Sequence, residues 1–190
     1  FYMYQTDASY GNVTSGRGHY LGRRSKDLVN WSIVGFPMAQ TPPNWIKDSL
    51  NAIRGRMGLA PISSPIYLYW APVVRNIGGK LRMYYSVVID NYIKTGLPNT
   101  TANFDNSWTE RAFIGLMEST DPANNVWVDK GYVISSVSDR VTGTEPWYRA
   151  STSDWSGYFK WNAIDPTYIV TPQGEHWLIY GSWHSGIPAV

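Results

Sequence analysis

The sequence predicts an all-β fold: a β-propeller built from repeated four-stranded blades, of which this chain supplies about the first two to three. Aromatic residues make up 15% of the 190 residues, with 10 Trp and 14 Tyr, and aromatic side chains favour strands. Glycine (17) and proline (12) are frequent, and both residues mark turns. A weak internal repeat of strand, polar turn, aromatic strand and small residue is the third observation.

Strands account for most of the expected elements, because aromatic and β-branched residues gather between turn residues along the chain. Gly78-Gly79, Asp121-Pro122 and Pro172-Gln173-Gly174 are the clearest turns. We expect strands at residues 1–6, 19–24, 31–34, 73–76, 81–88, 112–119, 127–135, 167–171 and 176–182. Two further segments, 27–31 and 125–129, are predicted to contribute to outer strands.

Only one helix is predicted, at residues 43–55. Trp45, Ile46, Leu50 and Ile53 fall roughly on one face of it at helical spacing. The segment is short, and we interpret it as a decoration on a loop.

The repeat divides the chain into three parts. Residues 71–86 and 165–182 are two copies of it, and residues 1–6 resemble the second half of an earlier copy. We expect an incomplete first blade with its loop at 1–62, a second blade with inserted loops at 63–156, and the start of a third blade at 157–190. The inserted loops are 92–109 and 137–156.

A propeller needs at least about four blades to close. We therefore expect later blades of the same polypeptide, or a second chain, to complete this one. The sequence opens inside the apolar run 1–4, which leads us to expect further residues before Phe1.

The charge balance excludes several function classes. The chain has 16 basic and 14 acidic residues, a net charge of +2, which favours neither nucleic acid nor an anionic membrane as a partner. It has no cysteine and thus no disulfide framework. No apolar run approaches the roughly 18–20 residues of a membrane span.

Several motifs, taken in order, resemble glycoside hydrolase family 43, specifically its endo-arabinanase and arabinofuranosidase branch. The resemblance covers nearly the whole chain apart from the inserted loops, and the order and spacing of the motifs make it specific. The motifs are Ser25-Lys26-Asp27-Leu28-Val29-Asn30-Trp31, Tyr69-Trp70-Ala71-Pro72, Arg111-Ala112-Phe113-Ile114-Gly115-Leu116, and Asn162-Ala163-Ile164-Asp165-Pro166 with Gly181-Ser182-Trp183.

The resemblance implies a five-bladed propeller that cleaves arabinose- or xylose-containing polysaccharide with inversion. We expect α-1,5-arabinan as the substrate and an extracellular or periplasmic location. Inversion needs a general acid and a general base about 6.5–9.5 Å apart, with room for a water molecule between them.

A third carboxylate in this family orients the acid and raises its pKa, because a nearby negative charge disfavours ionisation. Asp165 matches that carboxylate. The alternative interpretation is that Asp165-Pro166 merely starts a strand.

The base and the acid themselves are expected outside this chain, one ahead of Phe1 and one on a later blade. Asp7, Glu118 and Glu145 are weaker candidates, and Glu118 is expected to face solvent. Val73 stands where the family has an acidic residue after Trp-Ala-Pro. We therefore expect the 190-residue chain alone to hydrolyse nothing.

The resemblance also implies substrate-binding residues: Trp70, as a stacking platform, and Asn162, Ser182, Trp183 and His184. The alternatives are a core tryptophan and ordinary turn residues. No cofactor is readable in this chain, because the other histidines, His19 and His176, are not at ligand spacing from His184. The family often holds a central cation, calcium, through a histidine on a later blade.

Two alternative functions remain open. One is a propeller that binds carbohydrate without cleaving it. The other is a β-xylosidase or arabinoxylan arabinofuranosidase of the same family.

Overall fold

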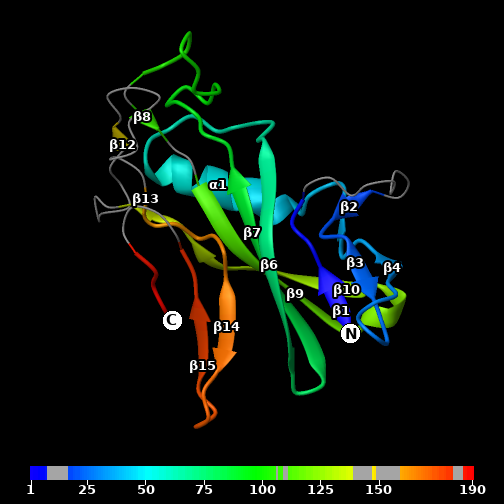
Figure 1. Cartoon of the computed structure of the whole chain (residues 1–190). Coiled ribbons are helices and arrows are strands. Elements are labelled where there is room, and N and C mark those ends of the chain that lie inside the picture. Colours follow the sequence, from blue (N-terminus) through cyan, green and yellow to red (C-terminus); the bar gives the residue numbers. More distant parts are fainter. Residues whose placement is uncertain (8–16, 106, 109–110, 139–146, 149–158, 182–185) are drawn as a thin grey trace.

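The described strands form three antiparallel sheets and three further short pairs, and the three sheets follow one another along the chain in the computed structural model (Figure 1). The structure describes residues 1–7, 17–105, 107–108, 111–138, 147–148, 159–181 and 186–190. The middle sheet has four strands, the first sheet three and the last sheet two. This arrangement confirms the predicted all-β class.

The middle sheet is a four-stranded antiparallel meander, which is the architecture of one propeller blade. Gly78 and Gly79 close its first hairpin with φ angles of 60° and 79°, as a two-residue type I′ turn requires. From one edge to the other, its strands are β6 (Tyr67–Ile77), β7 (Lys80–Ile89), β9 (Arg111–Asp121) and β10 (Val126–Ser135).

The other sheets flank this meander in the sequence. The first consists of β1 (Tyr2–Tyr4), β3 (Gly22–Arg24) and β4 (Ser32–Gly35), and the last of β14 (Thr167–Val170) and β15 (His176–Ile179). Short pairs join β2 (Gly18–His19) to β5 (Met38–Ala39), β8 (Ser107–Trp108) to β12 (Trp147–Tyr148), and β11 (Val137–Ser138) to β13 (Phe159–Trp161). A 3-10 turn, η1 (Pro122–Asn124), precedes β10.

The helix α1 (Asn44–Arg56) is part of the core, so its interpretation as a decoration is wrong. Ile46 and Leu50 are fully buried in the same apolar cluster as the middle sheet. Arg54 is also fully buried, and its guanidinium donates to the carbonyls of Ala60 (2.6 Å) and Ile93 (3.0 Å). Among the described residues, no helix is long and apolar enough to cross a bilayer.

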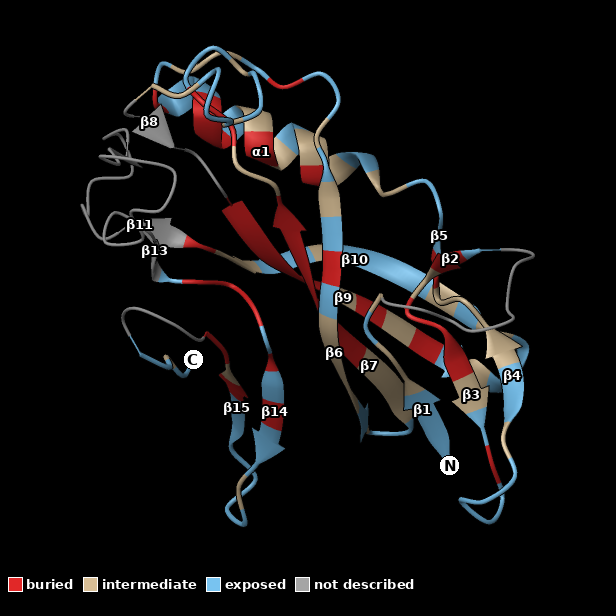
Figure 2. Cartoon of the chain, turned by 45° about the horizontal axis from the view of Figure 1, so that its top comes forward, coloured by how far each residue is buried: buried red, intermediate tan, exposed pale blue. Residues whose placement is uncertain are grey.

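Two apolar clusters lie on opposite faces of the middle sheet. Alternate residues of a strand point to opposite faces, and β7 follows this rule. Met83, Tyr85 and Val87 enter the cluster that also contains α1, whereas Tyr84 and Val88 enter the cluster that reaches the last sheet. Figure 2 shows β7 and β9 largely buried between their neighbours, whereas β14 and β15 carry exposed positions.

A glycine on the third strand of the middle sheet makes room for a buried tyrosine. Gly115 pairs with Tyr85 across β7 and β9. A Cβ at Gly115 would lie 2.2 Å from the Tyr85 ring. Close packing therefore accounts for the glycine in the third-strand motif.

Two predicted strand boundaries are wrong, one because of local hydrogen bonds and the other because of a left-handed backbone residue. Residues 27–31 form a turn before β4, because the Asp27 carboxylate accepts from the backbone N–H groups of Val29 (2.9 Å) and Asn30 (2.8 Å). The predicted strand 19–24 is interrupted at Tyr20, which has a φ of 64°. The remaining expected strands are present, with shifted ends.

Candidate functional site

The Trp-Ala-Pro motif forms a β-bulge on the inner edge strand β6. Trp70 pairs with Ser86 and Val73 with Tyr84, so Ala71 and Pro72 together stand opposite Tyr85 alone. Proline has no N–H to donate to a ladder and is confined to edges and bulges. Bulges re-aim side chains, and Trp70 here remains 38% exposed.

The segment from Asn162 to Asp165 is held by backbone hydrogen bonds just before β14. Ile164 N donates to Asn162 O (2.9 Å), and Gly181 N donates to Ile164 O (2.8 Å). Asp165 has a φ of 50°, a left-handed conformation that Asp tolerates better than most residues. Asp165 is exposed and lies just before β14.

Two buried serines from the middle sheet and its end anchor this segment. Ser86 Oγ accepts from Asp165 N at 3.0 Å, and Ser136 Oγ accepts from Ala163 N at 3.1 Å. Both serines are at most 1% exposed. Because Ser86 also pairs with Trp70, the structure brings Trp70 and Asp165 to the same residue.

The predicted role of Asn162 in substrate binding is not supported by its surroundings. Asn162 is only 5% exposed, and its Oδ1 accepts from Ser136 Oγ at 3.0 Å. Its side-chain oxygen thus holds the loop that carries Asp165. Ser182, Trp183 and His184 lie outside the described residues, as does Glu145, so their roles stay predictions.

Asp7 has a structural position at the seam between the first and middle sheets. Its backbone N donates to Tyr69 O (3.1 Å). Its carboxylate accepts from Tyr20 N (3.1 Å) and pairs with His19 Nδ1, and the His19 ring stacks on Tyr69 with centroids 3.6 Å apart. These contacts occupy both carboxylate oxygens, which argues against Asp7 as a general base.

Glu118 does not face solvent as expected, since only 13% of its side chain is exposed. It accepts from Lys80 Nζ (3.1 Å) and Arg82 Nε (3.0 Å), and Lys130 Nζ lies 3.9 Å away. The hydrogen bond from Lys80, followed by that from Arg82, lowers the pKa of Glu118. An ionised carboxylate in an ion-pair network is unsuited to donate a proton.

Tyr20 also forms a hydrogen bond with Ser86. Its hydroxyl donates to Ser86 O at 2.7 Å. Tyr20 is fully buried, and that burial raises its pKa well above the ordinary value of 10.0. The phenol therefore stays neutral and keeps its donor proton across the physiological range.

Val73, where the resemblance leads us to expect an acidic side chain, packs against the apolar cluster that reaches the last sheet. The described residues bring no three acidic, histidine or cysteine side chains together at a distance suited to a metal ion. The described residues therefore do not by themselves supply a calcium site.

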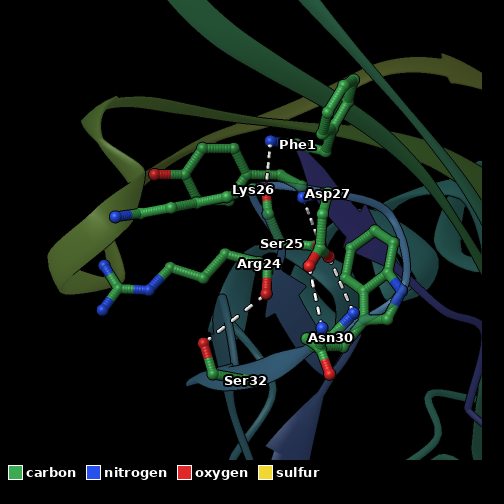
Figure 3. A pocket seen from close by; sticks show the side chains of 9 residues that line it. Phe1, Arg24, Ser25, Lys26, Asp27, Asn30 and Ser32 are labelled. Carbon is green, nitrogen blue, oxygen red and sulfur yellow. Dashed lines mark hydrogen bonds between the residues drawn. The ribbon is translucent and has the colours of Figure 1, made fainter.

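A pocket of about 760 Å³ lies elsewhere, at the edge of the first sheet (Figure 3). Phe1, Tyr2, Lys26 and Trp31 line part of it, and none of the predicted site residues that the structure describes does. The backbone nitrogen of Phe1 donates to Ser25 O at 2.7 Å. The walls of this pocket therefore come from the first sheet and the turn before β4.

The sequence reasoning missed Ser86, Ser136 and Tyr20. One signal was available for Ser86, which is a lone serine in the otherwise apolar and aromatic run 83–89. A buried polar group in such a run needs a hydrogen-bond partner. The identity of that partner depends on the packing of the last sheet and is not readable from sequence.

Comparison with known proteins finds a matching family model and several relatives of this chain. The family model described as "Glycosyl hydrolases family 43" matches residues 1–189. An extracellular endo-α-(1→5)-L-arabinanase of Bacillus subtilis is 31% identical over 86% of this chain and 36% of its own length. An extracellular exo-α-(1→5)-L-arabinofuranosidase, ArbA, of Cellvibrio japonicus is 27% identical over 86% of this chain and 34% of its own length.

Solved structures show a similar fold. The arabinanase Arb43A of Bacillus subtilis has a TM-score of 0.55 and 24% identity, covering 99% of this chain and 46% of the other. A Cellvibrio cellulosa α-L-arabinanase complexed with arabinohexaose has a TM-score of 0.52 and 25% identity, covering 90% of this chain and 40% of the other. The chain thus spans between about a third and just under half the length of these proteins.

Proposed function

The chain belongs to glycosyl hydrolases family 43, and on this premise we propose that the complete protein is an inverting glycoside hydrolase. Its substrate class is arabinose-containing plant polysaccharide, with linear α-1,5-arabinan as the main substrate. Names of related proteins support this choice, since they describe an endo-arabinanase and an exo-arabinofuranosidase.

One observation carries the proposal: Trp70 on β6 pairs with Ser86 in the ladder, and the backbone N–H of Asp165, just before β14, donates to the hydroxyl of the same serine. The exposed indole of Trp70 offers a flat apolar face on which the C–H face of a sugar ring can stack. Asp165, an exposed residue whose backbone N–H is held by Ser86, carries a carboxylate on the segment before β14. A platform and a carboxylate linked through one residue are suited to holding a glycosidic bond within reach of acid–base chemistry.

In this mechanism Asp165 does not transfer a proton. Its negative charge raises the pKa of the general acid, which keeps its proton for the departing glycosidic oxygen. A general base removes a proton from water, and the water attacks the opposite face of the anomeric carbon. We assign neither the acid nor the base to a residue of this chain.

We propose that residues 1–62, 63–156 and 157–190 are an incomplete first blade, a second blade and the start of a third. Further blades, in the same polypeptide or a second chain, complete the five-bladed ring. We also propose an extracellular or periplasmic location, supported by the word "extracellular" in the names of two relatives.

The direct test is incubation of the complete protein with debranched linear arabinan. We expect release of arabino-oligosaccharides for endo action, or of arabinose alone for exo action. Proton NMR of the first products should show the β-anomer, because inversion at an α-linkage produces it. Binding of arabinan without any product would instead support the non-catalytic propeller, and release of xylose from xylo-oligosaccharides would support the xylosidase.

A further inference from the structure

Ser86 is a buried hydroxyl at the centre of the middle sheet. It is fully buried on β7, between β6 and β9 (Figure 1). By strand alternation it shares a face with Tyr84 and Val88, which pack in the cluster that reaches the last sheet. Its side chain is thus directed to the side from which Asp165 approaches.

Three separate segments bond to this one residue. Asp165 N donates to its Oγ at 3.0 Å, and its Oγ donates to the bulge carbonyl of Ala71 at 3.5 Å. Its own carbonyl accepts from Tyr20 OH at 2.7 Å. Ser86 therefore links the connection between β2 and β3, the Trp-Ala-Pro bulge and the segment before β14.

The backbone of Asp165 needs such an anchor. A non-glycine residue at a φ of 50° is in a sparsely populated region, and such conformations persist only where the surroundings over-determine them. The bond from Gly181 N to Ile164 O fixes the preceding peptide. The ring of Pro166, which is buried, fixes the following φ. Ser86 supplies the remaining constraint, on the Asp165 N–H itself.

We propose that Ser86 is a positioning residue for Asp165: by accepting the Asp165 N–H it fixes the direction in which that carboxylate leaves the backbone. This inference rests on the proposed function, in which Asp165 acts through its charge. It assigns a role in the reaction to a residue that does not touch the substrate.

Loss of this anchor should change the pKa of the general acid in one direction. A carboxylate close to the general acid raises the pKa of that acid. When the carboxylate moves away, the pKa of the acid falls, and the acid loses its proton at a lower pH. The alkaline limb of the pH profile of kcat/KM, which reports the free-enzyme acid, should then move to lower pH.

The experiment compares four variants of the complete protein on linear arabinan. Ser86→Ala removes the acceptor, and Ser86→Cys keeps the volume but offers only a weak acceptor. Ser86→Thr keeps the hydroxyl. Ser136→Ala is the matched control, because Ser136 is equally buried and accepts a backbone N–H from the same loop, two residues before Asp165.

We expect Ser86→Ala and Ser86→Cys to shift the alkaline limb to lower pH and to reduce kcat about tenfold, as a misplaced catalytic group does. Ser86→Thr should keep the limb at its wild-type position, and Ser136→Ala, which loosens the same loop without removing the acceptor of the Asp165 N–H, should shift it less than Ser86→Ala does. The cysteine variant leaves no cavity, so it preserves the test if the alanine variant does not fold.

Asp165→Asn separates the two proposals. If Asp165→Asn shifts the alkaline limb of the kcat/KM profile but Ser86→Ala and Ser86→Cys do not, the role of Ser86 is overturned. The role of Asp165 is then left intact. A limb that Asp165→Asn does not move would overturn the proposed role of Asp165 itself. An equal shift in Ser136→Ala would also overturn the inference, since any loosening of the loop would then suffice.

Discussion

Trp70 is the residue through which the site should recognise sugar. Its exposed fraction, 38%, equals that of Trp177 on β15, but only Trp70 lies at the bulge opposite Ser86. Replacing Trp70 with alanine removes a stacking face worth on the order of 1 kcal/mol. We expect KM for arabinan to rise about five- to tenfold, with a smaller change in kcat, measured by initial rates on the complete protein.

The Trp177→Ala variant is the matched control for this effect, because it removes an equally exposed indole from a strand outside the site. It should leave KM unchanged. Equal increases in KM for both variants would show that loss of surface aromatic area in general, and not stacking at the bulge, weakens binding.

Glu118 should contribute to stability in a pH-dependent way. Hydrogen bonds from Lys80 and Arg82 lower its pKa in the folded protein, so its contribution is present above its ordinary pKa of about 4.3. That contribution is lost as pH falls through the lowered pKa. We expect Glu118→Gln to be less stable than the wild type by up to about 1 kcal/mol at pH 7.

Chemical denaturation from pH 7 to pH 3 measures this difference. The gap between wild type and Glu118→Gln should close at the acidic end, and 1 M salt should narrow it at pH 7, because salt screens surface charges. A gap that stays constant over the whole pH range would show that shape or packing, rather than charge, is responsible.

The sequence identified the residues that reach the surface of the site better than those that support it. Trp70 and Asp165 stand in recognisable motifs, and each is linked to Ser86, one through the β6–β7 ladder and the other through its backbone N–H. Their roles toward substrate stay predictions. Asn162 lies in such a motif, but it is buried and its side-chain oxygen accepts a hydrogen bond from Ser136. Ser86 and Ser136 carry no motif, because a supporting hydroxyl is defined by what packs against it and not by its neighbours in sequence.

At the scale of elements, α1 contributes to the core beyond what its sequence suggested. Its buried face packs against the middle sheet, and Trp45 Nε1 donates to Asp129 at 3.2 Å. Leu50→Ala should therefore destabilise the complete protein by about 2–5 kcal/mol, as in other large-to-small core substitutions. Asp48→Ala, at an exposed position of the same helix, should change stability by less than about 0.5 kcal/mol.

Thermal or chemical unfolding compares these two variants. Equally small losses of unfolding free energy in both variants would contradict the packing of α1 in the core and would support its interpretation as a loop decoration. The sequence could not settle this point, because the apolar stripe shows that one face is buried but does not show how deeply it is buried.

Strand positions were predictable and their register was not. The alternation in β7 and β9 locates both strands within one or two residues. By contrast, the turn at 27–31 depends on hydrogen bonds from the Asp27 side chain, which compete with strand pairing. The bulge at Ala71-Pro72 shifts the ladder by one residue, and proline alone predicts only that the ladder is interrupted there.

At the scale of the whole molecule, the candidate site lies at a seam between sheets. Tyr84 and Tyr168 stack across this seam with centroids 5.2 Å apart, and Arg75 Nε donates to Tyr168 O at 3.1 Å. Trp70 comes from one sheet and Asp165 from the segment that enters the next. The relative placement of the sheets therefore sets the geometry of the site, as expected where propeller blades meet around an axis.

The most direct test of the central claim is the turnover of Asp165→Asn on linear arabinan, measured together with its affinity for an arabino-oligosaccharide. The amide keeps the shape of the side chain and removes its charge. We predict that kcat falls about a hundredfold or more, while the Kd measured by calorimetry stays within about threefold of wild type, since the substrate platform is intact. A variant that turns over arabinan at the wild-type rate would contradict the account.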